Sequence, residues 1–406
     1  MNILMLSATF PYPPTQGGTQ VRTFNLLKYL SRHHQVTLAA LTSPDMTDAD
    51  LKALQEWVAE LVVFDRPNHT ASQRGFFAKI QRFSQFLRQG TPPSVLFSYS
   101  LEMQDWVDRA IQSNRYQVIT CEHSVNEIYV RSEWQKRIRT VVNVHSSVYG
   151  TCQNQLQTQT SENQWRDRLN LPLLKRYEQR YCNKFSNIVV TTEDDRDQLN
   201  AFNPTAKFQV IANGVDFTEF PNRTTDPGGH NLIFIGAMDN LANIDAAKFL
   251  CLEILPELQK RYPNTTIALV GARPTLEVLR LGDRPNITVT GRVPAMADYL
   301  HRATVCVIPM RTGFGIKNKT LEAMAAGTPI VASDRGLEGL AVDGENSPLR
   351  ALRANRVEDY VSAIARLFED PLLRNQMSRE ARSFVETHYT WERAGQCYEQ
   401  VLTELT

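Results

Sequence analysis

Long apolar runs, closely paired cysteines and an excess of either charge are all absent from this chain of 406 residues. No stretch approaches the roughly 20 apolar residues that a membrane-spanning helix needs. The six cysteines never occur as Cys-x-x-Cys, which argues against a zinc site and a disulfide framework and favours a reducing compartment. Because the formal net charge is only +1, we expect no nucleic-acid partner.

Three further absences narrow the range of possible functions. The N-terminus has no basic region ahead of its short apolar run, so we expect no signal peptide and a cytoplasmic protein. The glycines after the first predicted strand do not form Gly-x-Gly-x-x-Gly, which counts against a nicotinamide enzyme. No Asp-x-Asp pair lies at a predicted strand end, and Asp194-Asp195 begin a charged helix where acids complement the helix dipole. We therefore predict no metal and no cofactor.

The first half of the chain alternates short apolar or β-branched runs with longer amphipathic segments such as Val21–Leu30 and Leu101–Ile111. Strands that alternate with helices predict a parallel sheet with right-handed crossovers. Seven runs have the length and composition of strands: Ile3–Ser7, Gln35–Leu41, Glu60–Phe64, Gln117–Cys121, Thr140–His145, Asn187–Thr191 and Phe208–Ala212.

The alternation stops at a segment rich in Pro, Gly, Asn and Thr and then starts again, which predicts a linker and a second α/β domain. Its helices include Ile244–Gln259 and Asn318–Ala326, and its strands are Asn231–Gly236, Thr266–Gly271, Asn286–Thr290, Thr304–Pro309 and Pro329–Ser333. A last helix is indicated by the spacing of Trp391, Ala394, Tyr398 and Val401. The predicted boundaries are an N-terminal domain at 1–216, a linker at 217–230, a C-terminal domain at 231–387 and a final helix at 388–406.

The segment 309–329 carries the clearest chemical signal. A predicted strand ends at Pro309, a loop with Gly313 and Gly315 follows, and a helix starts near Asn318. The free backbone N–H groups at a helix start can bind an anion. Lys317 and Lys319 oppose the helix dipole there, and a bound phosphate would remove that conflict. A solvated basic loop is the alternative, and the flanking glycines favour the phosphate.

Residues 315–333 resemble the donor-binding motif of retaining family 4 glycosyltransferases with the GT-B fold, and look most like the bacterial branch associated with exopolysaccharides. Three other segments match the family in order: 12–22 resembles its glycine loop, 210–216 the end of its N-terminal domain, and 388–392 the start of its last helix. The resemblance implies two Rossmann-like domains whose parallel sheets face a cleft, with the C-terminal helix crossing back to the N-terminal domain.

The resemblance also assigns roles to residues. Glu322 would hold the ribose, Lys319 with the helix start would hold the diphosphate, and the loop at 291–293 would meet the nucleobase. The full set of implied donor-binding residues is Gly17, Gly18, Gly291, Arg292, Val293, Gly315, Ile316, Lys317, Asn318, Lys319, Thr320 and Glu322. For Gly17 and Gly18, a tight strand–helix turn explains the glycines equally simply.

Two histidines follow predicted strands of the first domain, His123 and His145. The family's active-site histidine lies at the end of the strand that precedes His145, so the resemblance implies that His145 is catalytic together with Lys319. His123 and Arg22 are candidates on the acceptor side. Residues alone leave a structural role open for either histidine, and a surface position open for Arg22.

The sequence departs from the family pattern at two places. Phe314 stands eight residues before Glu322, where members usually carry a second glutamate that contacts the donor sugar. The usual cations after the first strand of the second domain are also missing, because 236–243 contains neither Arg nor Lys. Lys317 and Lys319 are the candidates to replace that charge.

The segment 71–88 places Phe76, Phe77, Ile80, Phe83 and Leu87 on one helical face, with four cations and no acid elsewhere. This pattern suits a peripheral contact with anionic lipid at the inner face of the plasma membrane. A packed core helix with basic solvent positions explains it too and is slightly favoured.

Together these features predict a metal-independent glycosyltransferase of the hexosyltransferase type. Its donor would be a UDP- or GDP-linked sugar, its acceptor a hydroxyl of a glycan, a glycolipid or a small molecule, and retention is implied by resemblance alone. A non-catalytic nucleotide-sugar-binding protein is the alternative that Phe314 supports. A nucleotide-sugar epimerase of the same fold is a second alternative, although few carboxylates lie at the predicted strand ends.

Overall fold

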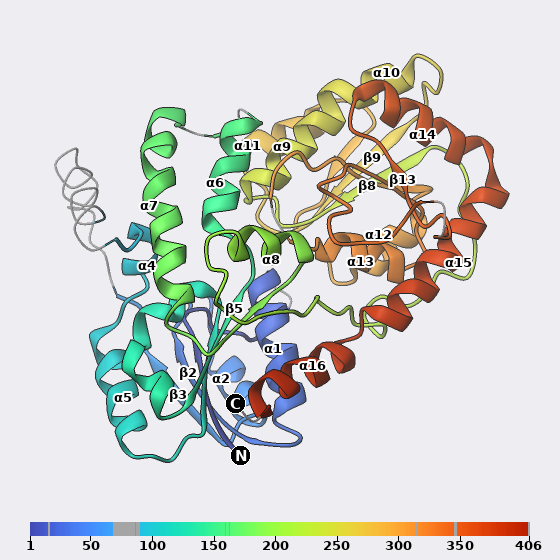
Figure 1. Cartoon of the computed structure of the whole chain (residues 1–406). Helices are drawn as coiled ribbons and strands as arrows, with labels where there is room; N and C mark the ends of the chain where they lie inside the picture. The colour runs from blue at the N-terminus through green and yellow to red at the C-terminus, as the bar shows by residue number, and fades with distance from the viewer. Residues whose placement is uncertain are drawn as a thin grey trace. The chain divides into compact units, whose positions relative to one another are not determined.

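The computed structural model describes residues 1–14, 17–67, 86, 90–158, 160–161, 163–313, 315–344 and 347–404. The chain forms two compact units, and the colours of Figure 1 follow it from the N-terminus in blue to the C-terminus in red. Unit 1 comprises Met1–Ala212 and Ala394–Thr406, and unit 2 comprises Asn213–Arg393. Within the described residues, no helix is long and apolar enough to cross a membrane.

Unit 1 is built on a seven-stranded sheet in which every neighbouring pair is parallel. Its strands are β1 (Asn2–Ser7), β2 (Gln35–Leu41), β3 (Glu60–Phe64), β4 (Val118–Glu122), β5 (Arg139–Val144), β6 (Asn187–Val190) and β7 (Phe208–Val210). They lie in the order β3-β2-β1-β4-β5-β6-β7, so the order reverses between β1 and β4. Ligands of doubly wound sheets bind at such a reversal, beyond the carboxyl ends of the strands.

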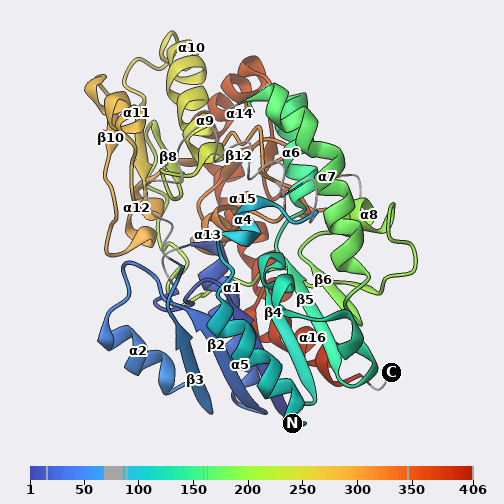
Figure 2. The ribbon, with the colours of Figure 1, turned by 90° about the vertical axis from the view of Figure 1, so that its left-hand side faces the viewer.

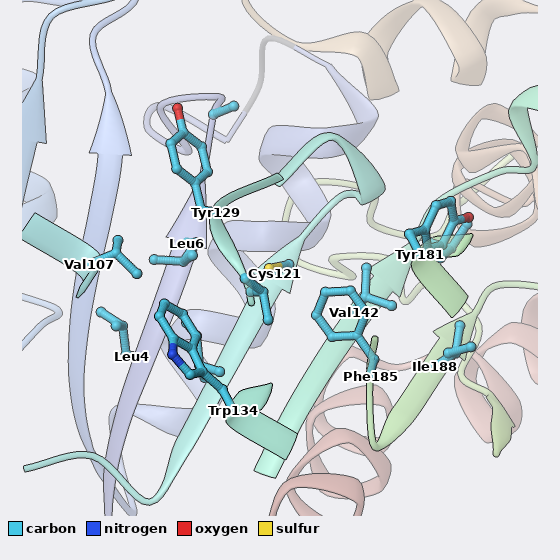
Figure 3. Close-up of a cluster of buried hydrophobic side chains, with 14 of the residues drawn as sticks. Leu4, Leu6, Val107, Cys121, Tyr129, Trp134, Val142, Tyr181, Phe185 and Ile188 are labelled. Atoms are coloured by element: carbon cyan, nitrogen blue, oxygen red, sulfur yellow. The ribbon is translucent and has the colours of Figure 1, made fainter. Parts of the chain in front are cut away.

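One face of this sheet packs on a large apolar cluster that includes Leu6, Val107, Trp134 and Tyr181 (Figure 3). The cluster draws on α5 (Leu101–Gln112), the 3-10 helices η2 (Ser124–Tyr129) and η3 (Ser132–Lys136), and α7 (Gln164–Cys182). The other helices of unit 1 are α1 (Gly18–Leu30), α2 (Asp48–Gln55), α4 (Pro93–Leu96), α6 (Val148–Gln157) and α8 (Glu193–Asn200).

The last helix, α16 (Trp391–Thr403), returns to unit 1 and packs on α1. A Cβ atom on Gly395 would lie 2.1 Å from the Tyr29 ring, so only glycine permits this close approach of the two helices. Tyr398 of the same helix donates a 2.6 Å hydrogen bond to the buried carboxylate of Glu122. The predicted crossing of the C-terminal helix back to the first domain is therefore confirmed.

Unit 2 contains a six-stranded parallel sheet in the order β10-β9-β8-β11-β12-β13, of which Figure 2 labels β10, β8 and β12. Its strands are β8 (Asn231–Ile235), β9 (Thr266–Val270), β10 (Ile287–Val289), β11 (Val305–Ile308), β12 (Ile330–Ala332) and β13 (Leu352–Arg353). The order reverses between β8 and β11. The sequence did not predict β13, because two residues are too few to show an alternating pattern.

The helices of unit 2 differ from the prediction in one place. The predicted helix 244–259 consists of α9 (Leu241–Phe249), a π-helical turn η4 (Leu250–Ile254) and α10 (Leu255–Gln259). The remaining elements are α11 (Leu276–Leu279), η5 (Arg280–Asp283), α12 (Met296–Arg302), α13 (Asn318–Ala325), α14 (Val357–Glu369) and α15 (Pro371–His388).

The segment 217–230, predicted as a linker, is part of unit 2. Arg223 is 8% exposed and lies 3.6 Å from the Asp226 carboxylate, which also binds Arg374 at 2.7 Å. These buried ion pairs hold the segment on unit 2, so its turn-forming composition reflects a packed loop. The units divide earlier, at Ala212 and Asn213.

Candidate functional site

Two glycines lie at the strand reversal of unit 2, and neither position has room for a side chain. Gly236 follows β8 with φ 149°, and Gly271 follows β9 with φ 155°. A Cβ on Gly271 would lie 1.8 Å from the Gly236 carbonyl oxygen. A Cβ on Gly236 would lie 2.8 Å from the Asn243 amide nitrogen and 3.0 Å from Lys319 Nζ. Glycine at these two positions thus lets the ends of β8 and β9, Asn243 and Lys319 pack closely together at this edge of the sheet.

Helix α13 begins beside this edge, after β11 and the glycine loop. Lys317 is its N-cap residue, and no side chain caps its first N–H groups within the described residues. Its first turn contains no acid to complement the helix dipole. The turn therefore offers backbone donors and positive charge together, as an anion site requires.

Lys319 extends from this turn to the end of β8. Its Nζ donates a short hydrogen bond to the Asn243 side-chain oxygen and lies 3.7 Å from the Met310 sulfur. It also lies 4.7 Å from the centre of the Phe234 ring. Asn243 is held in turn by a 2.8 Å bond from its amide to the Ala237 carbonyl oxygen. The ammonium group thus occupies the strand end that lacks a cation of its own in the sequence.

Burial shifts the pKa values of Lys319 and Glu322 toward each other. Desolvation lowers the pKa of Lys319 to about 7, opposed by the Glu322 charge and reinforced by Lys317. Desolvation raises the pKa of Glu322 to about 7, with the nearby Glu219 charge adding to the rise and Lys319 opposing it. Both groups therefore change charge near neutral pH, which is a common property of functional sites.

Lys317 has a different environment from Lys319. Its Nζ lies 3.2 Å from the buried carboxylate of Glu338 and also donates to the Gly315 carbonyl oxygen. Arg335 binds the other oxygen of Glu338 at 3.0 Å. Two cations thus share one carboxylate beside the start of α13.

The other residues of this loop contribute mainly backbone. Gly315 has φ 79°, and the Ile316 and Thr320 side chains are buried, with the Thr320 hydroxyl donating to the Gly336 carbonyl oxygen at 2.7 Å. The Asn318 side chain accepts a 2.8 Å bond from Asn213. Phe314 lies outside the described residues.

The loop at 291–293 follows β10 at the same edge of the sheet. Gly291 has φ 72°, and no atom lies within 4 Å of the position that its Cβ would take. Its carbonyl oxygen accepts a 3.2 Å bond from the Gly271 N–H, which places the loop beside the end of β9. Arg292 is exposed and Val293 is partly buried.

The strand reversal of unit 1 is occupied by a buried hydrogen-bonded network. Arg22, only 1% exposed, donates to the Asn143 side chain at 3.1 Å, and Asn143 donates to Glu122 at 3.0 Å. Glu122 also accepts the bond from Tyr398 of α16. Desolvation raises the pKa of Glu122, opposed by the Tyr398 hydrogen bond and the Arg22 charge. The alternative of a surface position for Arg22 is wrong, since its guanidinium lies inside unit 1.

His123 and His145 lie together at the ends of β4 and β5, with ring centres 5.0 Å apart. The His123 Nδ1 atom accepts a 3.3 Å bond from the Val125 N–H, so a neutral His123 carries its proton on Nε2. His145 Nε2 is buried and has no hydrogen-bond partner within the described residues. Desolvation lowers the pKa of His123 to about 4 and that of His145 well below 6.5. Both rings are therefore neutral at physiological pH.

Gly17 and Gly18 begin α1, next to this pair of strand ends. Gly17 is the N-cap residue in an extended conformation, and its carbonyl oxygen accepts the first helical bond from Val21 at 3.0 Å. Except for Phe86, which is buried, the segment 71–88 lies outside the described residues.

Several residues at these strand ends were not singled out from the sequence: Phe234, Asn243 and Met310 around Lys319, Glu219 near Glu322, and Glu338 beside Lys317. They come from four separate segments that only the fold brings together. The one available signal was Asn243, a polar residue in the first turn of the helix that follows a glycine-terminated strand.

Two family models match successive parts of the chain. The model described as Glycosyltransferase Family 4 matches residues 16–219, and the model described as Glycosyl transferases group 1 matches residues 229–370. The first match alone covers half of the 406 residues.

The curated relatives match about half of the chain and about half of their own length. Glycogen synthase of Mycobacterium tuberculosis is 27% identical over 48% of this chain and 48% of that protein. A GDP-mannose-dependent phosphatidylinositol monomannoside mannosyltransferase of Mycolicibacterium smegmatis is 27% identical over 48% of this chain and 56% of that protein.

Solved structures match along the whole chain at lower identity. Sucrose-phosphate synthase of Thermosynechococcus elongatus superimposes with a TM-score of 0.68 at 18% identity, covering 99% of this chain and 98% of the other. Anabaena HepE in complex with UDP gives a TM-score of 0.67 at 14% identity, with both chains covered completely. The predicted GT-B fold, with two Rossmann-like domains, is confirmed.

Proposed function

Because this chain belongs to glycosyltransferase family 4, we propose that it transfers a sugar from a nucleotide-diphosphate sugar to a hydroxyl group. The donor is a UDP- or GDP-linked sugar, and it is a substrate, so that no further cofactor takes part. The observation that carries the proposal is the position of Lys319 at the strand reversal of unit 2, within the first turn of a helix that no side chain caps among the described residues.

In this proposal the diphosphate binds at the start of α13. Negative charge grows on the leaving diphosphate during transfer, and fixed donors stabilise it most in a site that excludes water. Lys319 and the first N–H groups of α13 supply those donors. Because cations of the chain can meet the charge, we propose that the reaction is metal-independent. Turnover that persists in excess chelator would support this point.

The remaining donor contacts follow from the same geometry. Glu322 lies one helical turn beyond Lys319, and its carboxylate is proposed to accept hydrogen bonds from the ribose hydroxyls. The loop at 291–293 is proposed to meet the nucleobase, because Gly291 leaves its backbone open.

His145 is proposed to contact the donor sugar. A neutral imidazole cannot neutralise a phosphate, but it can donate or accept one hydrogen bond with a hydroxyl. The lowered pKa of His145 keeps it neutral, and its buried Nε2 atom has no partner among the described residues. His123, packed against His145, is proposed to support this position, and Arg22 acts through the buried network.

The acceptor and the stereochemistry rest on similarity. The similar proteins include enzymes named for lipid and lipopolysaccharide acceptors, such as the LpcC mannosyltransferase of Rhizobium leguminosarum. We therefore propose a glycan or lipid-linked acceptor at the inner face of the plasma membrane. Retention of configuration, an exopolysaccharide pathway and a membrane contact through 71–88 are proposed from the sequence resemblance alone.

Calorimetric titration of UDP and GDP tests the central claim, using the wild type, Lys319→Ala and the control Lys260→Ala. Lys260 is 70% exposed on α10 and serves as a matched loss of charge in the same unit. We expect one nucleotide to bind the wild type and the control, and Lys319→Ala to weaken it by about a hundredfold, since truncating a cation that binds a phosphate costs roughly 2–5 kcal/mol. Equal binding to all three proteins would place the diphosphate elsewhere.

Product analysis then separates the three possible activities. A transferase releases nucleotide diphosphate and gives a glycosylated acceptor, whereas an epimerase changes the donor sugar without any acceptor. A protein that binds the donor and leaves it unchanged in the presence of candidate acceptors would be a non-catalytic binder.

A further inference from the structure

Helix α7 presents an unusual surface on the outside of unit 1 (Figures 1 and 2). Its 19 residues include two large apolar side chains that face solvent, Trp165 at 78% exposure and Leu169 at 61%. They are four residues apart and therefore lie on one face of the helix. Exposed Pro172 continues the same face by one further turn.

The second half of this face is basic. The exposed residues at the following turns of this face are Lys175, Arg176 and Arg180. Arg168 lies beside Trp165, with its guanidinium 5.9 Å from the ring centre. We call the face formed by residues 165, 168, 169, 172, 175, 176 and 180 the α7 stripe. It carries apolar groups toward the start of the helix and cations toward its end.

The acids of α7 point the other way. Asp167 and Glu178 are 7% and 0% exposed. Asp167 accepts from Ser161 at 2.6 Å, and Glu178 accepts from Ser147 at 2.8 Å and from the Val148 N–H at 2.7 Å. Helix α6, which packs against α7, contains no charged residue. The α7 stripe therefore contains no exposed acid of its own helix, and among its cations Arg180 lies 3.8 Å from the buried Glu127 carboxylate.

We propose that the α7 stripe docks unit 1 onto an anionic lipid surface. Trp165 and Leu169 enter the headgroup region, and the cations lie against lipid phosphates. Tryptophan favours a membrane interface because its ring is apolar and its N–H is polar, and arginine and lysine extend their charges to the headgroups. An apolar edge combined with lysines and arginines is the composition of interfacial helices.

Other occupants fit the stripe less well. A second copy whose α7 lay parallel to this one would place the same cations against each other. A nucleic acid would gain little from Trp165 and Leu169 at the far end of the stripe. Lys175 Nζ lies 5.6 Å from the ring centre of Phe202, just beyond helix α8, and that helix carries the exposed acids Glu193, Asp194 and Asp197. The lipid-facing surface therefore ends on that side.

Vesicle sedimentation with the full chain tests the proposal. We expect binding to vesicles of equal parts phosphatidylcholine and phosphatidylglycerol, little binding to pure phosphatidylcholine, and weakening by salt. Each cation near an anionic surface contributes roughly fivefold, so Arg168→Gln, Lys175→Gln and Arg176→Gln together should lower the partition coefficient about a hundredfold. Trp165→Ala with Leu169→Ala should lower it by roughly tenfold or more.

Two control variants remove similar groups elsewhere on unit 1. Lys136→Gln with Arg137→Gln removes exposed cations, and Leu101→Ala removes a leucine that is 70% exposed. Quenching of tryptophan fluorescence by brominated lipid should fall in Trp165→Phe. Equal binding to both kinds of vesicle, or equal losses in the stripe and control variants, would overturn the proposal. A change in oligomeric mass in the stripe variants, without a change in vesicle binding, would point to a protein partner and also overturn it.

This inference is independent of the proposed sugar transfer. Nucleotide titration of each variant confirms its fold and should give the wild-type affinity. A chain that binds vesicles but not nucleotide would contradict only the transferase, and the reverse result only the lipid contact.

Discussion

The two units have sheets of the same parallel, doubly wound design, yet they use the point of strand reversal differently. In unit 1 the cation at this point, Arg22, is linked through Asn143 to the carboxylate of Glu122. In unit 2 the corresponding cation, Lys319, bonds to the neutral Asn243 and Met310. The first arrangement satisfies a charge internally, whereas the second leaves a cation available to an anion.

This difference shows that the topology of the sheet sets where a binding site can form. The side chains that pair at that point then decide whether a cation there is available to a ligand. A buried charge with a carboxylate partner stabilises the unit that contains it, and removing that partner is costly. A partly buried ammonium whose hydrogen-bond partners are neutral costs folding energy, and a bound diphosphate would offset that cost. The comparison leads to four predictions, beginning with the largest effect.

Glu122→Ala should lower the free energy of unfolding by about 3–5 kcal/mol, because the buried guanidinium of Arg22 would lose its carboxylate. Denaturant unfolding measures this loss, with Glu60→Ala as the control. Glu60 pairs with Arg115 at the surface, where an ion pair contributes about 0–1 kcal/mol. Nucleotide affinity should not change in either variant. If the loss in Glu122→Ala were no larger than in the control, the network would not hold unit 1 together.

Gly236→Ala should weaken nucleotide binding by about 2 kcal/mol, roughly thirtyfold, because its Cβ would displace Lys319 and Asn243. Gly228→Ala is the matched control. Gly228 also has a positive φ, 62°, but its Cβ would meet no atom within 4 Å, so this variant adds backbone strain alone. Calorimetric titration of nucleotide into both variants separates the effect of the clash from the effect of backbone strain. Similar affinities would show that the end of β8 does not position the binding cation.

Nucleotide affinity should fall as pH rises through about 7, by about tenfold per pH unit. The pKa of Lys319 is lowered to about 7 in the free protein, so the amine is charged below that pH and neutral above it. A bound diphosphate favours the ammonium form, and binding above pH 7 must therefore take up a proton. Titrations in buffers of different ionisation enthalpy measure that uptake.

The variant Lys319→Arg sharpens the same prediction. Because arginine stays charged on both sides of pH 7, nucleotide affinity in this variant should no longer fall as the pH rises above 7. An unchanged alkaline loss in Lys319→Arg would assign it to another group, with Glu322 as the first candidate because its pKa is raised to about 7.

Asn243→Ala should lower nucleotide affinity about fivefold, or about 1 kcal/mol, since one hydrogen bond that holds Lys319 is lost. Asn240→Ala provides the control, because Asn240 caps α9 through the Ala242 N–H without touching Lys319. Asn240→Ala should lower the free energy of unfolding by a similar amount, about 1 kcal/mol, and leave the nucleotide affinity unchanged. Equal affinities in the two variants would mean that Lys319 needs no support from α9.

Much of the fold followed from the sequence because its signals are local. Seven strands of unit 1 and five of unit 2 overlap their predicted segments, since each is a short apolar run between helical patterns. The π-helical turn at Leu250–Ile254 was not predicted, because five residues are too few to tell one helical period from another. The segment 217–230, predicted as a linker, lies in unit 2, and its turn-forming residues do not reveal that Arg223 pairs with Asp226.

The candidate site was predictable only in part, for a physical reason. The start of α13 has a pattern within one segment, so Lys317, Lys319 and Glu322 could be selected, and their roles remain predictions. The side chains that accept hydrogen bonds from the two lysines are far away in the sequence. Asn243 lies 76 residues from Lys319, and Glu338 lies 21 residues from Lys317. Likewise, the burial of Arg22 depends on Asn143, 121 residues further along the chain.

The return of α16 to unit 1 has a consequence for synthesis. Ala394, Tyr398 and Val401 are buried in the first unit, although they follow the whole of unit 2 along the chain. Domains of multidomain proteins usually fold in order as they emerge. Here the surface that receives α16 stays uncovered until the ribosome has made all of unit 2, and the buried Glu122 lacks the hydroxyl of Tyr398 for all of that time. Synthesis of α16, after that of unit 2, is therefore the step that completes the first domain.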